Sequence, residues 1–434
     1  MSDVELSKPL AAAIKQPPWP KLSEVLGPGL ITGASDDDPS GIATYSQAGA
    51  QFGYALGWTL LFSYPLMCAI QQISAQVGRV TGRGIAGNLR QFMPRYLSFS
   101  IVSLLLIANI INLGADLGAM AASVKLLVPV PLPLGIAGFA IVTILLETFV
   151  RYSRYVSVLK WLTLSLFAYV ATVFVVGVPW SQAISQIVWP HLEFSGAYLT
   201  VVVAVLGTTI SPYLFFWQAE AEVEAQNEDS GAQPLKQSPE QAPTALQRIR
   251  WDTYLGMGLS NLVALAIIIT TAATLHAHGQ TNIETSAQAA QALRPIAGPF
   301  TFTVFALGII GTGLLTVPVL AGSAAYALGE VFGWHVGLGL KANRAKAFYG
   351  TICIAVILGA LINASPLSPI KALFWSAVIN GVVAVPAMAI IMVLASRRDV
   401  MGAFLLRPLL KIVGWVATAV MVLAAGGMFA TMSL

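Results

Sequence analysis

The chain has 434 residues, of which 56% are hydrophobic and 10% are charged, and its formal net charge at pH 7 is +4. A soluble domain carries roughly 25% charged residues, so this composition, with a mean hydropathy of +0.76, indicates a membrane protein that crosses the bilayer several times. The small positive charge is no nucleic-acid signature, so we expect no nucleic-acid partner. Cys68 and Cys353 both lie in apolar stretches, which excludes a disulfide framework and a zinc pattern.

The first segment, residues 1–24, contains lysines and prolines but no apolar run, which indicates a cytosolic tail and not a cleaved signal peptide. Ten apolar spans would follow and form a transporter core over residues 25–394, and residues 395–434 would hold a cytosolic loop and an eleventh span. The spans are expected at about 25–50, 54–77, 98–124, 133–150, 155–178, 197–221, 252–275, 299–328, 346–363, 369–394 and 408–433.

The basic residues predict the orientation of these spans. With the amino terminus in the cytosol, only Lys125, Arg294 and Lys371 of the 23 lysines and arginines fall outside. We therefore expect a multi-pass protein of a bacterial inner membrane, surrounded by lipid. Its amino terminus would be cytosolic and its carboxyl terminus outside, and we expect a monomer.

The position of the longest internal loop predicts an internal repeat. Residues 225–250 are rich in polar residues and proline, and they indicate a flexible cytosolic linker next to the sixth span. Spans one to five and six to ten would then enter the membrane from opposite sides. The sequence thus predicts an all-α protein with two inverted repeats, over about 25–178 and 197–394.

Two of the predicted spans are interrupted at corresponding positions. The first contains Asp36-Asp37-Asp38-Pro39-Ser40-Gly41, and the sixth contains Gly207-Thr208-Thr209-Ile210-Ser211-Pro212. A carboxylate at membrane depth is unfavourable by several kcal/mol and is tolerated mainly where it has a function. Helices broken at matching positions of two repeats are typical of a transporter's binding site. Carboxylates beside free backbone carbonyls predict a site for a cation.

The three consecutive acids of the first break cannot all point in one direction, because neighbours on a helix are about 100° apart. Asp38, directly before the proline, is the predicted ligand. Asp36 and Asp37 would line the inner approach or carry protons, and the alternative is that they form hydrogen bonds to neighbouring helices.

A second group of polar residues lies on the third span. Asn109, Asn112 and Asp116 are spaced three and four residues apart, so they share one helical face. Asp116 and Asn112 are candidates for a proton or ion pathway, and the alternative for Asp116 is a protonated structural hydrogen-bonding group. No lysine or arginine lies deep in a span, so the membrane-embedded charge is negative and favours a cation over an anion.

Several of these segments resemble the Nramp family of divalent metal transporters. The similar segments are Gly27-Pro28-Gly29, Asp38-Pro39, Ala48-Gly49-Ala50-Gln51-Phe52-Gly53-Tyr54 and Gly78-Arg79-Val80-Thr81-Gly82-Arg83, with Asp116 at the position of the family's acidic residue in span three. The resemblance covers nearly the whole chain. It implies a LeuT-like fold of five plus five helices with an eleventh, in which metal binds between the broken helices 1 and 6.

The chain departs from the family's motifs at several positions. The family's Asp-Pro-Gly-Asn is Asp38-Pro39-Ser40-Gly41 here, and its Met-Pro-His is Ser211-Pro212-Tyr213. The family's glutamate after the span-three aspartate is Ala119, and no basic pair occurs in 349–362. These losses resemble those of the family's magnesium-transporting relatives, and they make proton coupling doubtful.

The resemblance implies a ligand set for the metal. It comprises Asp38, Ser211 and the backbone carbonyls of Ser35 and Thr208, completed by water. A methionine sulfur favours softer transition metals, so its replacement by Ser211 favours Mg²⁺ or Mn²⁺. The resemblance implies a carrier that works by alternating access and holds no cofactor. Two alternatives are a carrier of another cationic solute, such as an amine, and an Nramp-like protein without transport. An intramembrane enzyme finds no support in the sequence.

Overall fold

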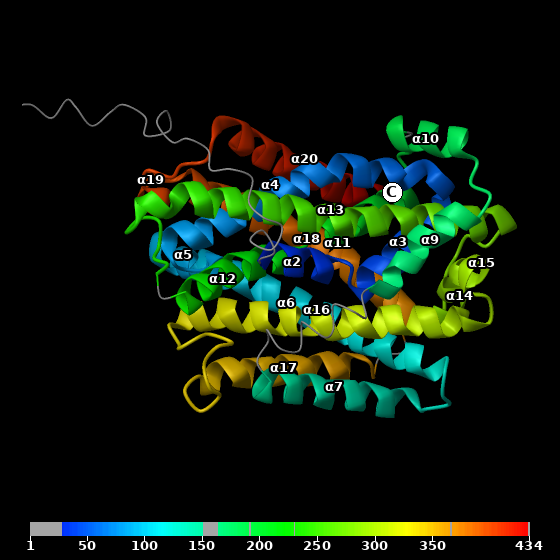
Figure 1. Cartoon of the computed structure of the whole chain (residues 1–434), viewed down its shortest axis with the longest axis horizontal. Coiled ribbons are helices and arrows are strands. Elements are labelled where there is room, and N and C mark those ends of the chain that lie inside the picture. The colour runs from blue at the N-terminus through cyan, green and yellow to red at the C-terminus, as the bar shows by residue number, and fades with distance from the viewer. Residues whose placement is uncertain (1–27, 151–163, 191, 230, 365–366, 433–434) are drawn as a thin grey trace, which may run out of the picture.

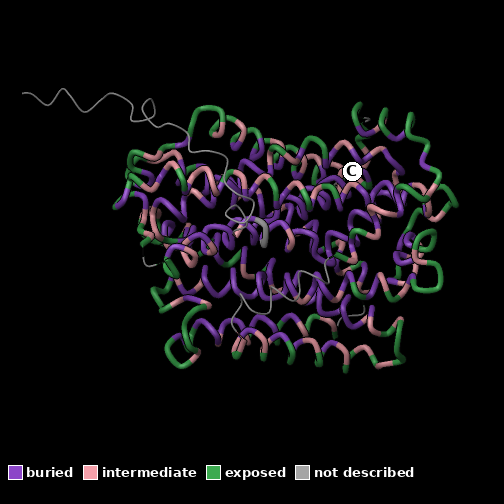
Figure 2. The backbone as a smooth tube through the Cα atoms, in the orientation of Figure 1, coloured by how far each residue is buried: buried purple, intermediate pink, exposed green. Residues whose placement is uncertain are grey.

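The structure, a computed structural model, describes residues 28–150, 164–190, 192–229, 231–364 and 367–432. Every regular element within these ranges is a helix, as the composition predicts. The long helices lie side by side in one bundle (Figure 1), and residues at the centre of the bundle are buried while those at its margin are exposed (Figure 2).

The first half of the chain contains a broken helix followed by four further spans. The long elements are α2 (Pro28–Asp36), α3 (Pro39–Phe52), α4 (Gly57–Thr81), α6 (Arg95–Lys125), α7 (Leu132–Phe149) and α9 (Phe167–Val175). Two short helices, α5 (Ile85–Phe92) and α10 (Trp180–Val188), lie at the ends of the bundle. Much of the predicted fifth span falls outside the described residues, and α9 with the turn before it is its described part.

The second half repeats this order. Its long helices are α11 (Gly196–Thr209), α12 (Pro212–Glu228), α13 (Ala242–Thr274), α16 (Thr301–Phe332), α17 (Lys346–Ile362), α18 (Pro369–Ser396) and the additional α20 (Pro408–Met432). Short helices α14 (Ser286–Ala290), α15 (Arg294–Ala297) and α19 (Arg398–Met401) lie in the connections. Eight described helical stretches are long and apolar enough to cross a membrane. The stretch Pro39–Thr81 holds parts of two predicted spans, α3 and α4. Two shorter stretches, Leu164–Val175 and Lys346–Ile362, are also apolar. These stretches are consistent with the eleven predicted spans.

Both predicted breaks are present in the structure. Proline lacks an N–H group and disfavours a helical conformation in the residue before it, so each helix restarts at a proline. Asp38, before Pro39, is extended with φ −69° and ψ 169°, and Ser211, before Pro212, is extended with φ −79° and ψ 131°. The sequence thus places Asp38 and Ser211 at equivalent positions of the two repeats.

The four half-helices occupy the middle of the bundle, where glycines allow close helix contact. A Cβ atom on Gly33 of α2 would lie 2.3 Å from the backbone of Gly256 on α13. A Cβ atom on Gly207 of α11 would lie 2.1 Å from the carbonyl oxygen of Ala377 on α18. Helices α12 and α4 also contact each other. The broken helices are therefore held between long, continuous ones.

The segment predicted as a flexible linker, residues 225–250, is largely structured. Helix α12 extends to Glu228 and α13 already begins at Ala242. The connection between them is anchored by Arg79 at the end of α4, which donates to the side chain of Gln226 at 2.7 Å and to the backbone of Gln233 at 2.8 Å. The connection is therefore shorter than the predicted linker, because the helices on both sides extend into it.

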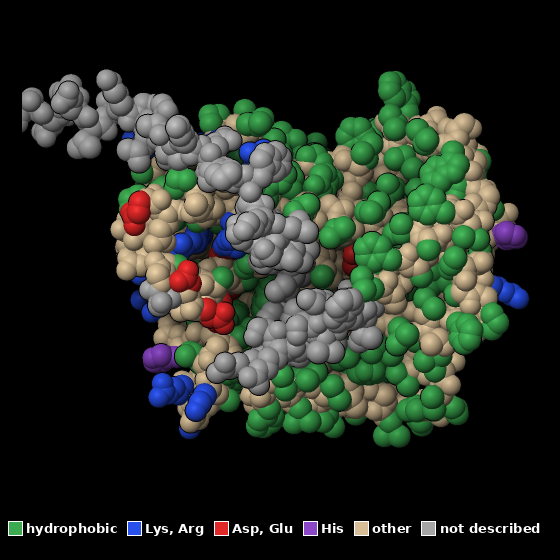
Figure 3. All heavy atoms as spheres, in the orientation of Figure 1, with side chains coloured by type: hydrophobic (Ala, Val, Ile, Leu, Met, Phe, Trp, Pro, Cys, Tyr) green, Lys and Arg blue, Asp and Glu red, His purple; other side chains and the backbone are tan. Residues whose placement is uncertain are grey.

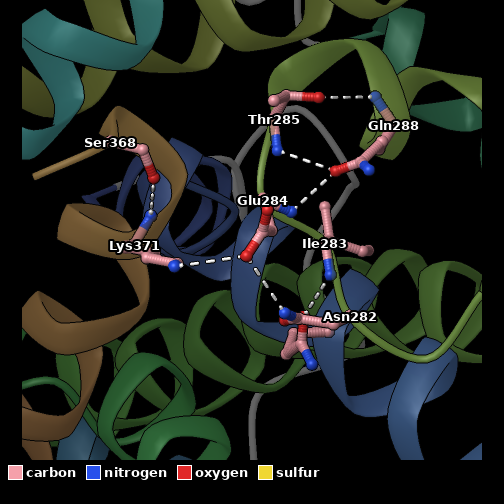
Figure 4. Close-up of polar contacts among 8 residues, drawn as sticks. Asn282, Ile283, Glu284, Thr285, Gln288, Ser368 and Lys371 are labelled. Atoms are coloured by element: carbon pink, nitrogen blue, oxygen red, sulfur yellow. Dashed lines mark hydrogen bonds and ion pairs between the residues drawn. The ribbon is translucent and has the colours of Figure 1, made fainter.

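The two ends of the bundle differ in charge. Most charged side chains visible in Figure 3 gather on the left, at the end that carries α5, α19 and the last turn of α12. We call this the charged end; it comprises the connections 82–94, 229–241, 333–345 and 397–407. At the opposite end, Lys371 of α18 forms a 3.3 Å ion pair with Glu284 (Figure 4). The side chain of Gln288 accepts from the backbone of Glu284 at 2.8 Å.

Candidate functional site

Asp38 lies in the first break and is 2% exposed. It is the N-cap residue of α3, and its carboxylate accepts from the backbone N–H of Gly41 at 2.6 Å. The hydroxyl of Ser40 donates to its two oxygens at 2.7 and 2.8 Å. Residues of this type at an N-cap satisfy backbone donors that the first helical turn leaves free. The sequence following the proline therefore fixes the carboxylate at the break.

Asn112 of α6 connects Asp38 to a third helix. Its amide nitrogen donates to Asp38 at 3.1 Å, and its amide oxygen accepts from the hydroxyl of Ser376 on α18 at 2.7 Å. The predicted pathway residue is thus in direct contact with the predicted ligand. Asn109, on the same helix, instead binds α16, where it donates to Ser323 at 2.8 Å.

The backbone carbonyl of Ser35, on α2, accepts hydrogen bonds from two other helices. It accepts from the hydroxyl of Tyr213 on α12 at 3.2 Å and from the hydroxyl of Thr316 on α16 at 3.1 Å. The break in the first span has therefore freed a carbonyl, as predicted. In this conformation two side chains of the protein satisfy it.

The polar side chains of the second break form hydrogen bonds within their own segment and with α3. The hydroxyl of Ser211 donates to the carbonyls of Gly207 at 2.8 Å and Thr208 at 2.7 Å. The hydroxyl of Thr208 donates to Tyr45 of α3 at 2.8 Å. Among the hydrogen bonds of the described residues, none joins Ser211 to Asp38. The structure therefore brings Asp38 and Asn112 together, while Ser211 and Thr208 bond with each other and with Tyr45.

The remaining acids of the site have different surroundings. Ser260 of α13 donates to Asp36 at 2.6 Å and to Asp37 at 3.2 Å, so these two contact a neighbouring helix. Asp116 is 0% exposed, and neither of its carboxylate oxygens has a hydrogen-bond partner among the described residues.

Four buried carboxyl groups thus gather around the break without a basic partner. The ion pairs of the described residues join Arg248 to Glu222, Lys371 to Glu284 and Arg397 to Asp399, and none of them includes an acid of the site. Ionised carboxylates in a low-dielectric interior are strongly unfavourable unless a cation or a proton neutralises them. The arrangement is therefore suited to binding a positive charge.

The family comparison decides the affiliation of the chain. The sequence model of the family described as "Natural resistance-associated macrophage protein-like" matches residues 29–431. The chain belongs to the Nramp family. The resemblance seen in the sequence motifs is thereby confirmed.

Relatives and solved structures agree with this assignment. The Nramp chain is 28% identical over 409 residues to the divalent metal cation transporter MntH of Deinococcus radiodurans, covering 93% of this chain and 88% of that one. It is 26% identical over 404 residues to MntH of Klebsiella pneumoniae, covering 92% of each.

In structure, the Eremococcus coleocola manganese transporter has a TM-score of 0.71 at 17% identity, over 94% of this chain and 86% of that one. Mhp1, a nucleobase-cation-symport-1 family transporter, has a TM-score of 0.56 at 15% identity, over 94% and 93% of the two chains. These likenesses show the fold, a LeuT-like membrane protein with two inverted repeats and discontinuous helices 1 and 6.

The positions at which this Nramp protein departs from the family's motifs lie directly at the site. A Cβ atom on Gly41, where the motif has asparagine, would lie 3.3 Å from a carboxylate oxygen of Asp38. Tyr213, where the motif has histidine, donates to the Ser35 carbonyl. At these two positions the chain lacks the polar side chains of the family's motifs, and its tyrosine joins the two broken helices.

Sequence reasoning missed several polar residues of the site. Thr316 of α16 donates to the Ser35 carbonyl, whereas Thr312 bonds back to Gly308 in its own helix at 3.0 Å. Ser260 on α13 and Ser376 on α18, which contact Asp36 and Asn112, were also not predicted. The only sequence signal for such residues is a polar side chain within a long apolar helix. That signal does not indicate which neighbouring helix the side chain faces.

Proposed function

We propose that the protein carries a divalent metal cation across the membrane by alternating access, with Asp38 as the principal ligand. The observation that carries this proposal is the buried Asp38 carboxylate in the break, near Asp116 and without a basic partner among the described residues. A membrane-embedded acid of this kind attracts cations. The naming of the relatives as divalent metal cation transporters supports the same substrate class.

The donor atoms available favour a metal that prefers oxygen. The proposed shell comprises Asp38, the hydroxyl of Ser211 and the carbonyls of Ser35 and Thr208, with water. Within the described residues no group of three His, Cys, Asp or Glu side chains is placed to hold a metal. Such a shell, without sulfur or imidazole, suits Mg²⁺ and Mn²⁺, and Mg²⁺ keeps several of its waters when bound.

Metal binding would exchange hydrogen bonds that the protein now makes with itself. A 180° turn of the Asn112 amide would present its oxygen to a metal at Asp38, while its nitrogen could donate to the Ser376 hydroxyl. Asn112 would thereby compensate for the asparagine that Gly41 has replaced. Release of the Ser35 carbonyl by Tyr213 would supply a further ligand.

The proposal also specifies the orientation of the protein in the membrane and the residues of the ion pathway. The charged end would face the cytosol, with the amino terminus inside and the carboxyl terminus outside, in a bacterial inner membrane where the chain acts as a monomer. Asp116, Asp37, Asp36 and Asn112 would form the ion or proton pathway.

Flux measurements on the purified protein in proteoliposomes would test this function. We expect saturable uptake of Mg²⁺ or Mn²⁺ by the wild-type protein and none by Asp38→Ala. Repeating the measurement with and without a pH gradient would show whether protons move with the metal. If no ion of a divalent panel gave saturable flux, or if Asp38→Ala transported as well as wild type, the proposal would be overturned.

A further inference from the structure

Three glutamates of α12 connect this half-helix to α13 and α16. Glu222 forms an ion pair with Arg248 of α13. Glu224 accepts from the hydroxyl of Tyr326 on α16 and from the backbone N–H of Leu338 at 2.9 Å. Glu220 is 3% exposed, and its carboxyl group lies beside that of Glu330 on α16, since both are within 3 Å of the same point above Gly84. These acids therefore fasten α12 to its neighbours at the charged end.

Glu330 connects the same helix pair to α5. Its carboxylate accepts from the backbone N–H of Gly84 at 2.8 Å and of Gly87 at 2.6 Å, at the start of α5. A Cβ atom on Gly84 would lie 1.6 Å from Glu220 Oε1 and 2.7 Å from Glu330 Oε2. Both carboxyl groups therefore occupy space that exists only because residue 84 is glycine. We call Glu220, Glu330, Gly84 and Gly87 the charged-end latch.

The latch requires a proton. Ionised carboxylate oxygens only accept hydrogen bonds, so a hydrogen bond between two carboxyl groups needs one of them to be protonated. Two backbone donors stabilise the ionised form of Glu330, which leaves Glu220 as the group that carries the proton. Two ionised carboxylates in contact would repel each other instead.

Other charged groups around the latch do not replace this proton. Arg83 and Arg90 lie on the α5 side, and Arg90 donates to the backbone carbonyl of Glu330 at 3.2 Å and not to either carboxylate. Glu224 on α12 adds negative charge, and Tyr326 on α16 is engaged with Glu224. No ion pair of the described residues includes Glu220 or Glu330.

We propose that Glu220 is a proton-binding residue that latches the charged end shut: it holds a proton while α12 contacts α5 and α16, and releases it to water when they separate. In the opening step the O–H bond of Glu220 breaks, the proton passes to solvent, and the carboxylate left behind repels Glu330. Because α12 begins at the site and runs to the charged end, the latch controls one route out of the site. This inference rests on the proposed transport function, to which it adds a proton-dependent gate.

Hydrogen–deuterium exchange of the full chain in lipid nanodiscs would test the latch without any metal. The readout is the protection of the Gly82–Phe92 segment over a pH series, with labelling times scaled to the intrinsic exchange rate. For a one-proton latch, the segment's protection factor should fall by about tenfold for each pH unit above the titration of Glu220. Glu220→Gln, whose amide can donate to Glu330 at every pH, should remain protected throughout.

Two further variants make the result decisive. Glu228→Gln removes a charge from the same helix at an exposed position and should behave as wild type. Gly84→Ala places a Cβ atom where the carboxyl groups meet and should leave the segment unprotected at all pH values. Monodispersity on size exclusion checks the fold of each variant.

Wild-type protection that does not change with pH would overturn the latch, as would a Glu220→Gln variant that keeps the wild-type pH dependence. Absence of metal flux in the wild-type protein is a separate result that concerns the transport proposal alone.

Discussion

Replacing Asp38 by asparagine separates its role in metal binding from its role in folding. Asn and Asp are about equally good N-cap residues, so Asp38→Asn should retain the 2.6 Å hydrogen bond from Gly41 and the start of α3. The variant loses the negative charge that faces the metal. Asp38→Ala, in contrast, loses both the charge and the cap, and the missing cap should lower stability by about 1 kcal/mol.

The expected loss of affinity follows from the burial of the site. Removing one partner of a buried charge pair costs about 3–5 kcal/mol, which corresponds to a reduction in metal affinity of about 100-fold to several thousand-fold. Isothermal titration with Mn²⁺ and Mg²⁺ would measure this loss for both variants. Thermal unfolding in detergent should give a lower midpoint for Asp38→Ala only.

A matched control is Asp399→Asn on α19, which removes an exposed aspartate paired with Arg397 at the charged end and should leave metal binding unchanged. If Asp38→Asn bound metal within about threefold of wild type, the carboxylate would not be a ligand and the reasoning would be refuted. If the thermal unfolding midpoint fell equally for Asp38→Asn and Asp38→Ala, the capping role of residue 38 would not be separable from its charge, and this part of the reasoning would be refuted.

Three further substitutions test other parts of the structure. Ser211→Met should raise uptake of Cd²⁺ and Mn²⁺ relative to Mg²⁺, because a thioether favours softer metals, and an unchanged flux ratio would remove Ser211 from the ligand set. Asn112→Leu should weaken metal binding by about 1.5–3 kcal/mol, the range for a polar contact to a charged group, because the amide oxygen proposed to turn toward the metal is lost, and titration showing wild-type affinity would remove Asn112 from the ligand set. Gly207→Ala should destabilise the protein by about 1–3 kcal/mol or more, because its Cβ would lie 2.1 Å from the Ala377 carbonyl. Its control is Gly138→Ala on α7, where a Cβ atom meets nothing within 4 Å, and equal thermal midpoints for the two would disprove the close helix contact.

The sequence predicted the broken helices because local rules determine them. An X-Pro pair within an apolar span forces an extended residue before the proline, and both Asp38 and Ser211 are extended. Hydropathy located the continuous spans by the same kind of local signal. Their ends were less predictable: α13 begins at Ala242, ten residues before the predicted start at 252, because its first turns are amphiphilic and lie at the charged end.

The contacts within the site could not be predicted from the sequence, because they join distant segments. The partners of the Ser35 carbonyl, Tyr213 and Thr316, are 178 and 281 residues away from it. The family resemblance identified Tyr213 only as a lost histidine. The directions in which the acids point also depend on tertiary contacts. Ser260 binds Asp36 and Asp37 from α13, whereas Asn112 of α6 contacts Asp38.

The buried acids at the charged end and those in the break differ in their partners, because among the described residues an arginine pairs with an acid of the first group only. At the charged end, Glu222 has Arg248, Glu224 has Tyr326 and Leu338, and Glu330 has two backbone amides. In the break, Asp116 has no hydrogen-bond donor among the described residues, and Asp38 is not part of any of their ion pairs.

At the charged end these contacts fasten helices to one another, whereas the four acids of the break have no basic partner among the described residues and are unfavourable until a positive charge arrives. A mobile cation should therefore reside at the break and not at the charged end. Glu220 is the exception, since the group beside its carboxyl is another carboxyl, that of Glu330, and a hydrogen bond between the two requires a proton. Occupancy of the break by metal and of Glu220 by a proton would thus be the two charge-dependent events that govern which end of the protein is open.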